Sequence, residues 1–148
     1  MPKILIYDRL AVMRELYRRE FQEEGYNVLI TSSLRDALNV FRNESPALVL
    51  FSIEHFGVEL LGTVEQMLSI NRHIPIIFAG SDADAPDSGC AELMHLSLEK
   101  QSDLVALKHA IRDLCLYPDT AVRMRKHSQN GRDWIRASNT MQIVGKIA

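Results

Sequence analysis

The chain alternates short runs of apolar residues with longer stretches in which apolar residues recur every three or four positions. Short apolar runs are typical of buried strands, and the longer spacing is typical of helices with one buried face. The run from Ala47 to Phe51 ends at the polar Ser52 and suits a strand that is covered on both faces. The other predicted strands are Lys3–Tyr7, Tyr26–Ile30, Pro75–Ala79 and Glu92–Leu96.

Helical spacing fills most of the intervals between these runs. In the first such stretch the predicted inner face includes Val12, Tyr17 and Phe21, and Gly25 marks the end of the helix. The predicted helices are Ala11–Glu24, a stretch capped by Ser32 or Ser33 that runs to about Asn43, Glu59–Asn71 and Glu99–Leu116. Strands that alternate with helices predict an α/β fold: a doubly wound, five-stranded parallel sheet with the flavodoxin-like order 2-1-3-4-5.

Composition places the chain among ordinary globular proteins. Of its 148 residues, 47% are hydrophobic and 24% are charged. No apolar run approaches the ~20 residues that a membrane span needs, and no signal-peptide pattern opens the chain. Cys90 and Cys115 form neither a CxxC pair nor a disulfide framework, so we expect a cytoplasmic location.

The net charge of −2 is unevenly distributed. Residues 1–116 form an acidic body, which we expect to be one domain, and residues 117–148 form a basic tail, for which we expect a short helix. The tail's basic residues include Arg123, Arg125, Lys126, Arg132 and Arg136, and Trp134 lies among them. These side chains offer a possible nucleic-acid contact, but the tail is short for a DNA-binding domain. A linker or dimerisation arm is the favoured interpretation.

Three stretches resemble the receiver domain of two-component response regulators. They are Ile4–Asp8, Ala47–Ser52 with Gly57 following, and Ile74–Phe78. Gly25-Tyr26 and Ala37-Leu38 also match that family's usual pattern, so the resemblance covers roughly residues 2–116. It implies a CheY-like fold and a role in signal transduction. It also implies that an ordinary member accepts a phosphoryl group from a kinase histidine, with Mg²⁺, on an aspartate that ends the third strand.

The residues at the family's chemical positions depart from its pattern. Of the acidic pair after the first strand, Asp8 is kept and Arg9 replaces the second member. The phosphoacceptor position holds Ser52, and the hydroxyl position after the fourth strand holds Gly80, with Ser81 one place later. The remaining departures are Leu93 at the switch aromatic, Leu96 at the lysine that ends the fifth strand, and Ser97 at the following proline.

These departures predict a degenerate phosphorylation pocket, formed by Asp8, Arg9, Ser52, Glu54, Gly80, Ser81 and Leu96. A serine hydroxyl is a poor nucleophile without a neighbouring base. Arg9 places a positive charge where a cation would need an oxygen ligand, and it is positioned to pair with Asp8 or Glu54. We expect no catalytic residue, no cofactor and no metal site, with Asp8 as the only remnant ligand. Asp8 is expected to pair with Arg9 or to cap the first helix.

The segment between Gly80 and Gly89 is shorter than in the family, which predicts a shortened fourth helix and a remodelled partner surface. We therefore expect a pseudo-receiver, not an enzyme, that binds signalling proteins and self-associates through its last helix or tail. Ser138–Ala148 loosely resembles the stretch that opens the ATPase domain of sigma-54-dependent activators. The start of a truncated output domain is therefore an alternative interpretation of the tail. The rival functions are a receiver still switched by phosphotransfer, a DNA-binding regulator that uses the tail, and a reader of a small anion beside Arg9 and Ser52.

Overall fold

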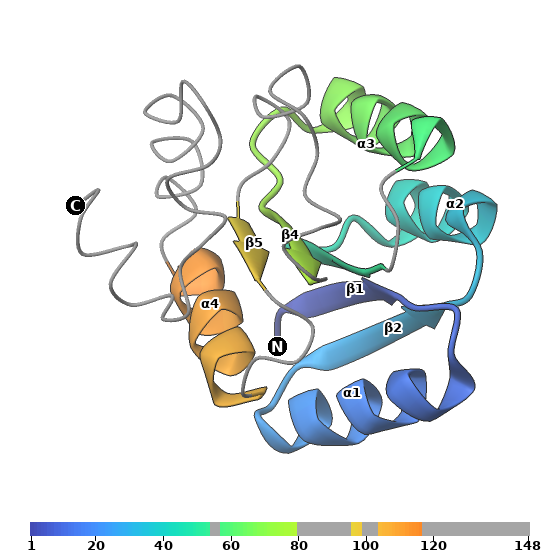
Figure 1. Cartoon of the computed structure of the whole chain (residues 1–148). Coiled ribbons are helices and arrows are strands. Elements are labelled where there is room, and N and C mark those ends of the chain that lie inside the picture. The colour runs from blue at the N-terminus through green and yellow to red at the C-terminus, as the bar shows by residue number, and fades with distance from the viewer. Residues whose placement is uncertain (54–56, 80–95, 99–103, 117–148) are drawn as a thin grey trace.

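The computed structural model describes residues 1–53, 57–79, 96–98 and 104–116. Figure 1 shows the elements in chain order, with the remaining residues as a thin trace. The elements are β1 (Lys3–Tyr7), α1 (Ala11–Glu23), β2 (Asn27–Thr31), α2 (Leu34–Glu44), β3 (Leu48–Ser52), α3 (Val58–Ile70), β4 (Ile76–Ala79), β5 (Leu96–Leu98) and α4 (Leu104–Leu116). From β1 to β4, each predicted element agrees with the observed one to within one or two residues.

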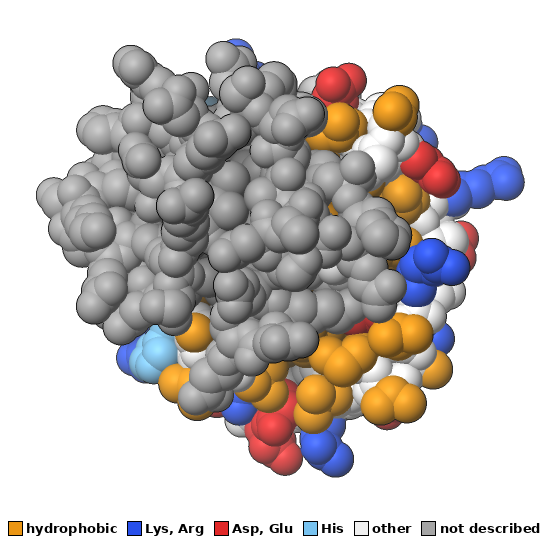
Figure 2. All heavy atoms as spheres, in the orientation of Figure 1, with side chains coloured by type: hydrophobic (Ala, Val, Ile, Leu, Met, Phe, Trp, Pro, Cys, Tyr) orange, Lys and Arg blue, Asp and Glu red, His pale blue; other side chains and the backbone are white. Residues whose placement is uncertain are grey.

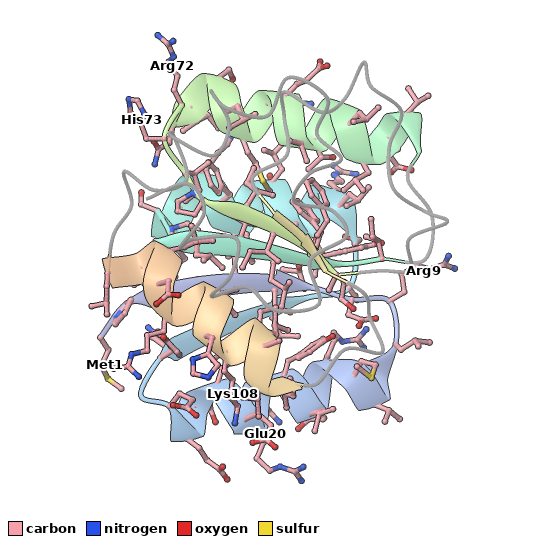
Figure 3. All side chains as sticks on the ribbon, turned by 60° about the vertical axis from the view of Figure 1, so that its left-hand side comes forward. Met1, Arg9, Glu20, Arg72, His73 and Lys108 are labelled. Carbon is pink, nitrogen blue, oxygen red and sulfur yellow. The ribbon has the colours of Figure 1, made fainter. Side chains whose placement is uncertain are left out.

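The strands form one five-stranded parallel sheet in the order β2-β1-β3-β4-β5. Helices α1 and α4 lie on one face of the sheet and helices α2 and α3 on the other, as Figure 1 and Figure 3 both show. Crossover connections between parallel strands produce this two-sided cover. The predicted doubly wound, flavodoxin-like fold is therefore confirmed.

The central strand β3 is buried along its whole length, as its unbroken apolar sequence predicts. Neighbouring strands place an aromatic row across it, with Phe51 stacked on Phe78 at a ring-centroid distance of 5.6 Å. Tyr7 lies 6.0 Å from Phe51 on the other side. Side chains alternate between the two faces of a strand, so Ser52, the next residue, projects to the face opposite this row.

Local signals in the sequence fix the ends of the helices. Ser33 is the N-cap of α2, where its side-chain oxygen accepts a hydrogen bond of 3.1 Å from the backbone N–H of Asp36. The same helix ends at Ser45, whose φ of 48° lies in the left-handed region. Gly25 follows α1 with a φ of +94°, a conformation that glycine adopts without steric cost.

Replacement of the α2 cap gives a first prediction. We expect Ser33→Ala to lower the free energy of unfolding by about 1 kcal/mol, because the N–H of Asp36 loses its partner. Ser32→Ala is the matched control: Ser32 is exposed and precedes the cap, so its loss should be nearly neutral. Urea denaturation of both variants measures the difference, and equal effects would contradict the assignment of the cap to Ser33.

Two predictions of the sequence analysis are wrong. The last strand was expected at Glu92–Leu96, but β5 is Leu96–Leu98, with Leu96 opposite Ile77 at its beginning. Val12 was expected on the inner face of α1, but its side chain is 80% exposed. The inward-facing residues of α1 are Tyr17 and Phe21, which are buried as predicted.

Helix α4 is joined to α1 by an ion cluster on their shared face of the sheet. Lys108 Nζ lies 3.2 Å from Glu20 Oε2 and 3.4 Å from Glu24 Oε1, and Figure 3 shows Lys108 extending from α4 toward Glu20 on α1. Buried apolar residues of α4, among them Leu107, Ile111 and Leu114, complete the contact with the core as predicted.

None of the helices in the described part of the chain is both long and apolar enough to cross a bilayer. The predicted shortened helix between Gly80 and Gly89 lies outside the described residues, and so does the basic tail.

Candidate functional site

Polar side chains end three neighbouring strands at the carboxyl edge of the sheet. Thr31 ends β2, Asp8 follows β1, and Ser52 ends β3; all three are buried. The strand register pairs Tyr7 with Thr31 on one side and with Phe51 on the other, so Asp8 and Ser52 lie side by side, one residue beyond the level of Thr31. The carboxyl edge of an open parallel sheet is where ligands usually bind in such folds.

Ser52 is bonded to a tyrosine from the helix above it. The hydroxyls of Tyr17 and Ser52 lie 3.3 Å apart, and both side chains are about 2% exposed. Burial raises the pKa of the Tyr17 phenol above its ordinary value, an effect that its hydrogen bond with Ser52 only partly offsets. The phenol is therefore neutral at physiological pH, and it cannot act as a base toward Ser52.

Asp8 holds the turn between β1 and α1. Its Oδ1 accepts a hydrogen bond of 2.9 Å from the backbone N–H of Leu10, which is the N-cap residue of α1. Its own backbone N–H donates to the carbonyl oxygen of Thr31 at 3.2 Å. The prediction that Asp8 caps the first helix is therefore wrong: Leu10 is the N-cap residue, no side chain accepts a capping hydrogen bond from α1, and Asp8 instead orders the residue at the cap position.

Arg14 closes the same turn from inside α1. One guanidinium nitrogen, Nη1, donates to the backbone carbonyl oxygens of Asp8 and Arg9 at 2.8 and 2.9 Å. The arginine is thus committed to the backbone of the turn, and its positive charge lies next to the carboxyl edge. Sequence reasoning identified neither Arg14 nor Tyr17 as a site residue.

Arg9 does not project into the site. Its side chain is exposed, and Figure 3 shows it pointing outward from the end of the sheet. Its charge still reaches Tyr7, where it opposes the rise in the pKa of the phenol that burial causes. Leu10 and Val12 next to it are 50% and 80% exposed, and Figure 2 shows hydrophobic side chains gathered over this end of α1.

The structure brings together Asp8 and Ser52 of the predicted pocket. The predicted position of Leu96 is wrong. Leu96 was expected at the carboxyl end of the last strand, but it is the first residue of β5. It pairs with Ile77, two residues before the end of β4. Glu54, Gly80 and Ser81 lie outside the described residues, as do Leu93 and the basic residues of the tail.

The oxygen atoms described at this edge do not match the ligand set of a magnesium site. Mg²⁺ prefers an octahedral set of oxygen ligands that includes carboxylates. Asp8 supplies a carboxylate here, while the hydroxyl of Thr31 donates to the carbonyl oxygen of Ile6 at 3.2 Å. Within the described residues, no three His, Cys, Asp or Glu side chains lie close enough together to hold a metal ion.

A double-mutant cycle tests the bond between Tyr17 and Ser52. We expect Tyr17→Phe and Ser52→Ala each to lower the free energy of unfolding by about 1 kcal/mol, because each leaves a buried hydroxyl without its partner. The double variant should cost less than the sum, since neither hydroxyl is then left behind. Thermal and urea unfolding of the four proteins measure the coupling, and strictly additive costs would show that the bond contributes nothing.

Searches for relatives by sequence find no matching family model and no matching curated protein. Solved structures with the same fold do match. One is a chain in the complex of histidine kinase ThkA with response regulator TrrA; it is 24% identical, with a TM-score of 0.67, and the match covers 77% of this chain and 98% of that one.

Two further matches agree with it. TrrA from Thermotoga maritima, solved with Mg²⁺ and beryllofluoride, is 24% identical with a TM-score of 0.64, over 77% of this chain and 99% of that one. A CheY-like receiver domain protein from Methanospirillum hungatei is 18% identical with a TM-score of 0.69, over 80% and 97%. The described chain therefore has the fold of response regulator receiver domains.

Proposed function

We propose that this chain is a signalling domain of the receiver type that works through contacts with other proteins and does not carry a phosphoryl group at the end of β3. The observation that carries this proposal is the state of Ser52. It occupies the position where the resemblance places the phosphoacceptor aspartate, it is buried, and its hydroxyl is bonded to Tyr17.

The chemistry around Ser52 favours this function over phosphotransfer. A serine that accepts a phosphoryl group needs a base within hydrogen-bond reach, and the described partner is a neutral phenol. The histidines in the described residues are not placed to act as this base: His73 follows α3 at the opposite edge of the sheet, and His109 lies on the exposed side of α4. A phosphoryl group on Ser52 would also displace the aromatic side chain that packs against it.

The domain then acts through a surface that binds other proteins and not through a chemical reaction. The fold resemblance supports a place in two-component signalling, where receiver domains meet protein partners, and we propose a protein partner and self-association through α4. The chain's role is that of a binding module without an enzymatic step. The DNA-binding rival rests on tail residues outside the described part of the chain. The anion-reader rival rests on Arg9, whose side chain points outward from the end of the sheet.

Beryllofluoride with Mg²⁺ tests the proposal, because this complex mimics an acyl phosphate on a receiver aspartate. We expect no change in melting temperature when the protein is heated with both reagents, while TrrA, which has been solved with this ligand, serves as the positive control. A stabilisation of this chain that requires both reagents together would overturn the proposal.

A further inference from the structure

We propose that the groove between α4 and the turn from α1 to β2 binds a small organic acid that has one carboxylate and an apolar body. We call it the α4 groove. Its volume is about 670 Å³, and small-molecule sites in proteins typically have about 300–1,000 Å³. Pro2 and Tyr26, which directly precede β1 and β2, line one side of it, and α4 lines the other. The groove therefore lies at the edge of the sheet opposite to Ser52.

Among the described residues, one cation of the α4 groove is left for a ligand. Lys108 lies 3.2 Å from Glu20 Oε2 and 3.4 Å from Glu24 Oε1, so its charge is already paired; Figure 3 shows Lys108 and Glu20 extending toward each other. Arg112 lines the same groove and is exposed, and no described carboxylate, that of Asp113 included, forms an ion pair with it. Arg112 is therefore the anchor that an anionic group would meet.

A hydroxyl lies near this arginine. The charge of Arg112 opposes the rise in the pKa of the Tyr26 phenol that burial causes, so the guanidinium is close enough to act on the phenol. Because burial dominates and the pKa is raised, the phenol keeps its proton at physiological pH and can donate it in a hydrogen bond. The ring of Tyr26 packs edge-on against Phe21 at a centroid distance of 6.3 Å, which holds it in place. A planar guanidinium beside a phenolic O–H suits the two oxygens of a carboxylate.

Apolar surface follows one turn further along α4. Leu116 lies four residues after Arg112, so both side chains are on the same side of the helix, and Leu116 is 60% exposed. Cys115 beside it also lines the groove, and burial raises its pKa to about 11, which indicates surroundings of low polarity. A ligand whose carboxylate contacts Arg112 can therefore place an apolar group against Cys115 and Leu116.

The acidic residues around the groove limit the charge of the ligand. Glu20 and Glu24 share a single lysine, so the α1 wall keeps a negative charge, and the side chain of Glu24 is 48% exposed there. Asp113 raises the pKa of the Tyr26 phenol, so its charge also reaches that end of the groove. One carboxylate is matched by the arginine, whereas a second negative charge would face these acids. The α4 groove therefore favours a monocarboxylate over a phosphate ester or another polyanion.

Titration of the full chain with phenylacetate tests the site, with the backbone amide signals followed by heteronuclear NMR. We expect saturable shifts at Gly25, Tyr26 and Arg112, which line the groove, and none at Ser52. The neutral phenylacetamide has nearly the same shape, and it should bind about tenfold or more weakly because it lacks the charge that Arg112 pairs with. Inorganic phosphate should give no shifts at the groove. Shifts confined to other parts of the chain, or equal binding of the acid and the amide, would overturn the proposal.

Matched variants identify the anchor. Arg112→Gln should weaken the binding of phenylacetate about tenfold or more, while Arg19→Gln, which removes an exposed arginine of α1 outside the groove, should leave it unchanged. Leu116→Ser should also weaken binding, and Ile70→Ser, at a residue of α3 that is 50% exposed, should not. Equal affinity of the native protein and Arg112→Gln for phenylacetate would overturn the anchor and with it the proposal.

The inference goes beyond the proposed function, and the two can fail separately. Phenylacetate binding depends on α4 and the α1–β2 turn, whereas the beryllofluoride test concerns the end of β3. A chain that is stabilised by beryllofluoride with Mg²⁺ and also binds phenylacetate in the groove would refute the proposed function alone. A chain that responds to neither would refute this inference alone.

Discussion

Phe51→Ala is expected to lower the free energy of unfolding by about 3–5 kcal/mol. Phe51 is fully buried at the centre of the sheet and stacks on Phe78 at 5.6 Å, with Tyr7 on its other side at 6.0 Å. Its loss leaves a cavity between two aromatic neighbours whose backbone positions are fixed by strand pairing. A domain of this size has about 5–15 kcal/mol of stability, so the variant should unfold at a much lower urea concentration.

Val58→Ala is the matched control for this substitution. Val58 begins α3 a few residues further along the chain, and its side chain is 86% exposed, so its truncation should change stability by about 0.5 kcal/mol or less. If Phe51→Ala were as mild as Val58→Ala, the aromatic row would not be the packed centre of the sheet that the structure describes.

Ser52→Asp restores the acidic residue that the resemblance places at the end of β3, and we expect it to be poorly tolerated. Asp8 is 1% exposed at the same level of the neighbouring strand, so a second carboxylate at residue 52 would be buried beside a like charge. We expect Ser52→Asp to be less stable than Ser52→Asn by about 3 kcal/mol at neutral pH. The two side chains have nearly the same size, so the difference isolates the charge.

The dependence on pH separates charge from packing at residue 52. Repulsion and burial raise the pKa of a carboxyl group, so the folded state of Ser52→Asp favours the protonated acid. The gap to Ser52→Asn should therefore be full above the raised pKa and should close as the pH falls toward about 4, the ordinary pKa of aspartate. A gap that is absent at neutral pH, or that does not change between pH 8 and pH 5, would show that the carboxyl edge is not the dry, acidic environment inferred here.

The sheet and its order could be predicted because parallel strands leave a strong signal. Buried strands such as Leu48–Ser52 read as continuous apolar runs, and the helices between them allow few connections. The short strand Leu96–Leu98 has a polar residue at its centre and too few residues to give such a run, so the sequence predicted its position wrongly. Val12 follows the helical period, yet it lies in the first turn of α1 and is exposed. Periodicity alone does not say how far the sheet extends beneath a helix.

The candidate site could be predicted only in part, for a different reason. Asp8 and Ser52 were found because each follows a strand whose end the sequence marks clearly. Tyr17 was identified only as a core residue, because its contact with Ser52 joins positions 35 residues apart and depends on how α1 crosses the sheet. Arg14 gives no sequence signal that distinguishes a side chain bonded to the β1–α1 turn from an exposed one.

We propose that this chain carries no phosphoryl acceptor at the end of β3. Incubation with acetyl phosphate and Mg²⁺, followed by intact mass measurement, tests this absence, with TrrA treated in parallel as a receiver of the same fold. We predict that the mass of this chain does not change. A gain of one phosphoryl group that Ser52→Ala or Asp8→Asn abolishes would contradict the claim and would identify the protein as a phosphorylated switch.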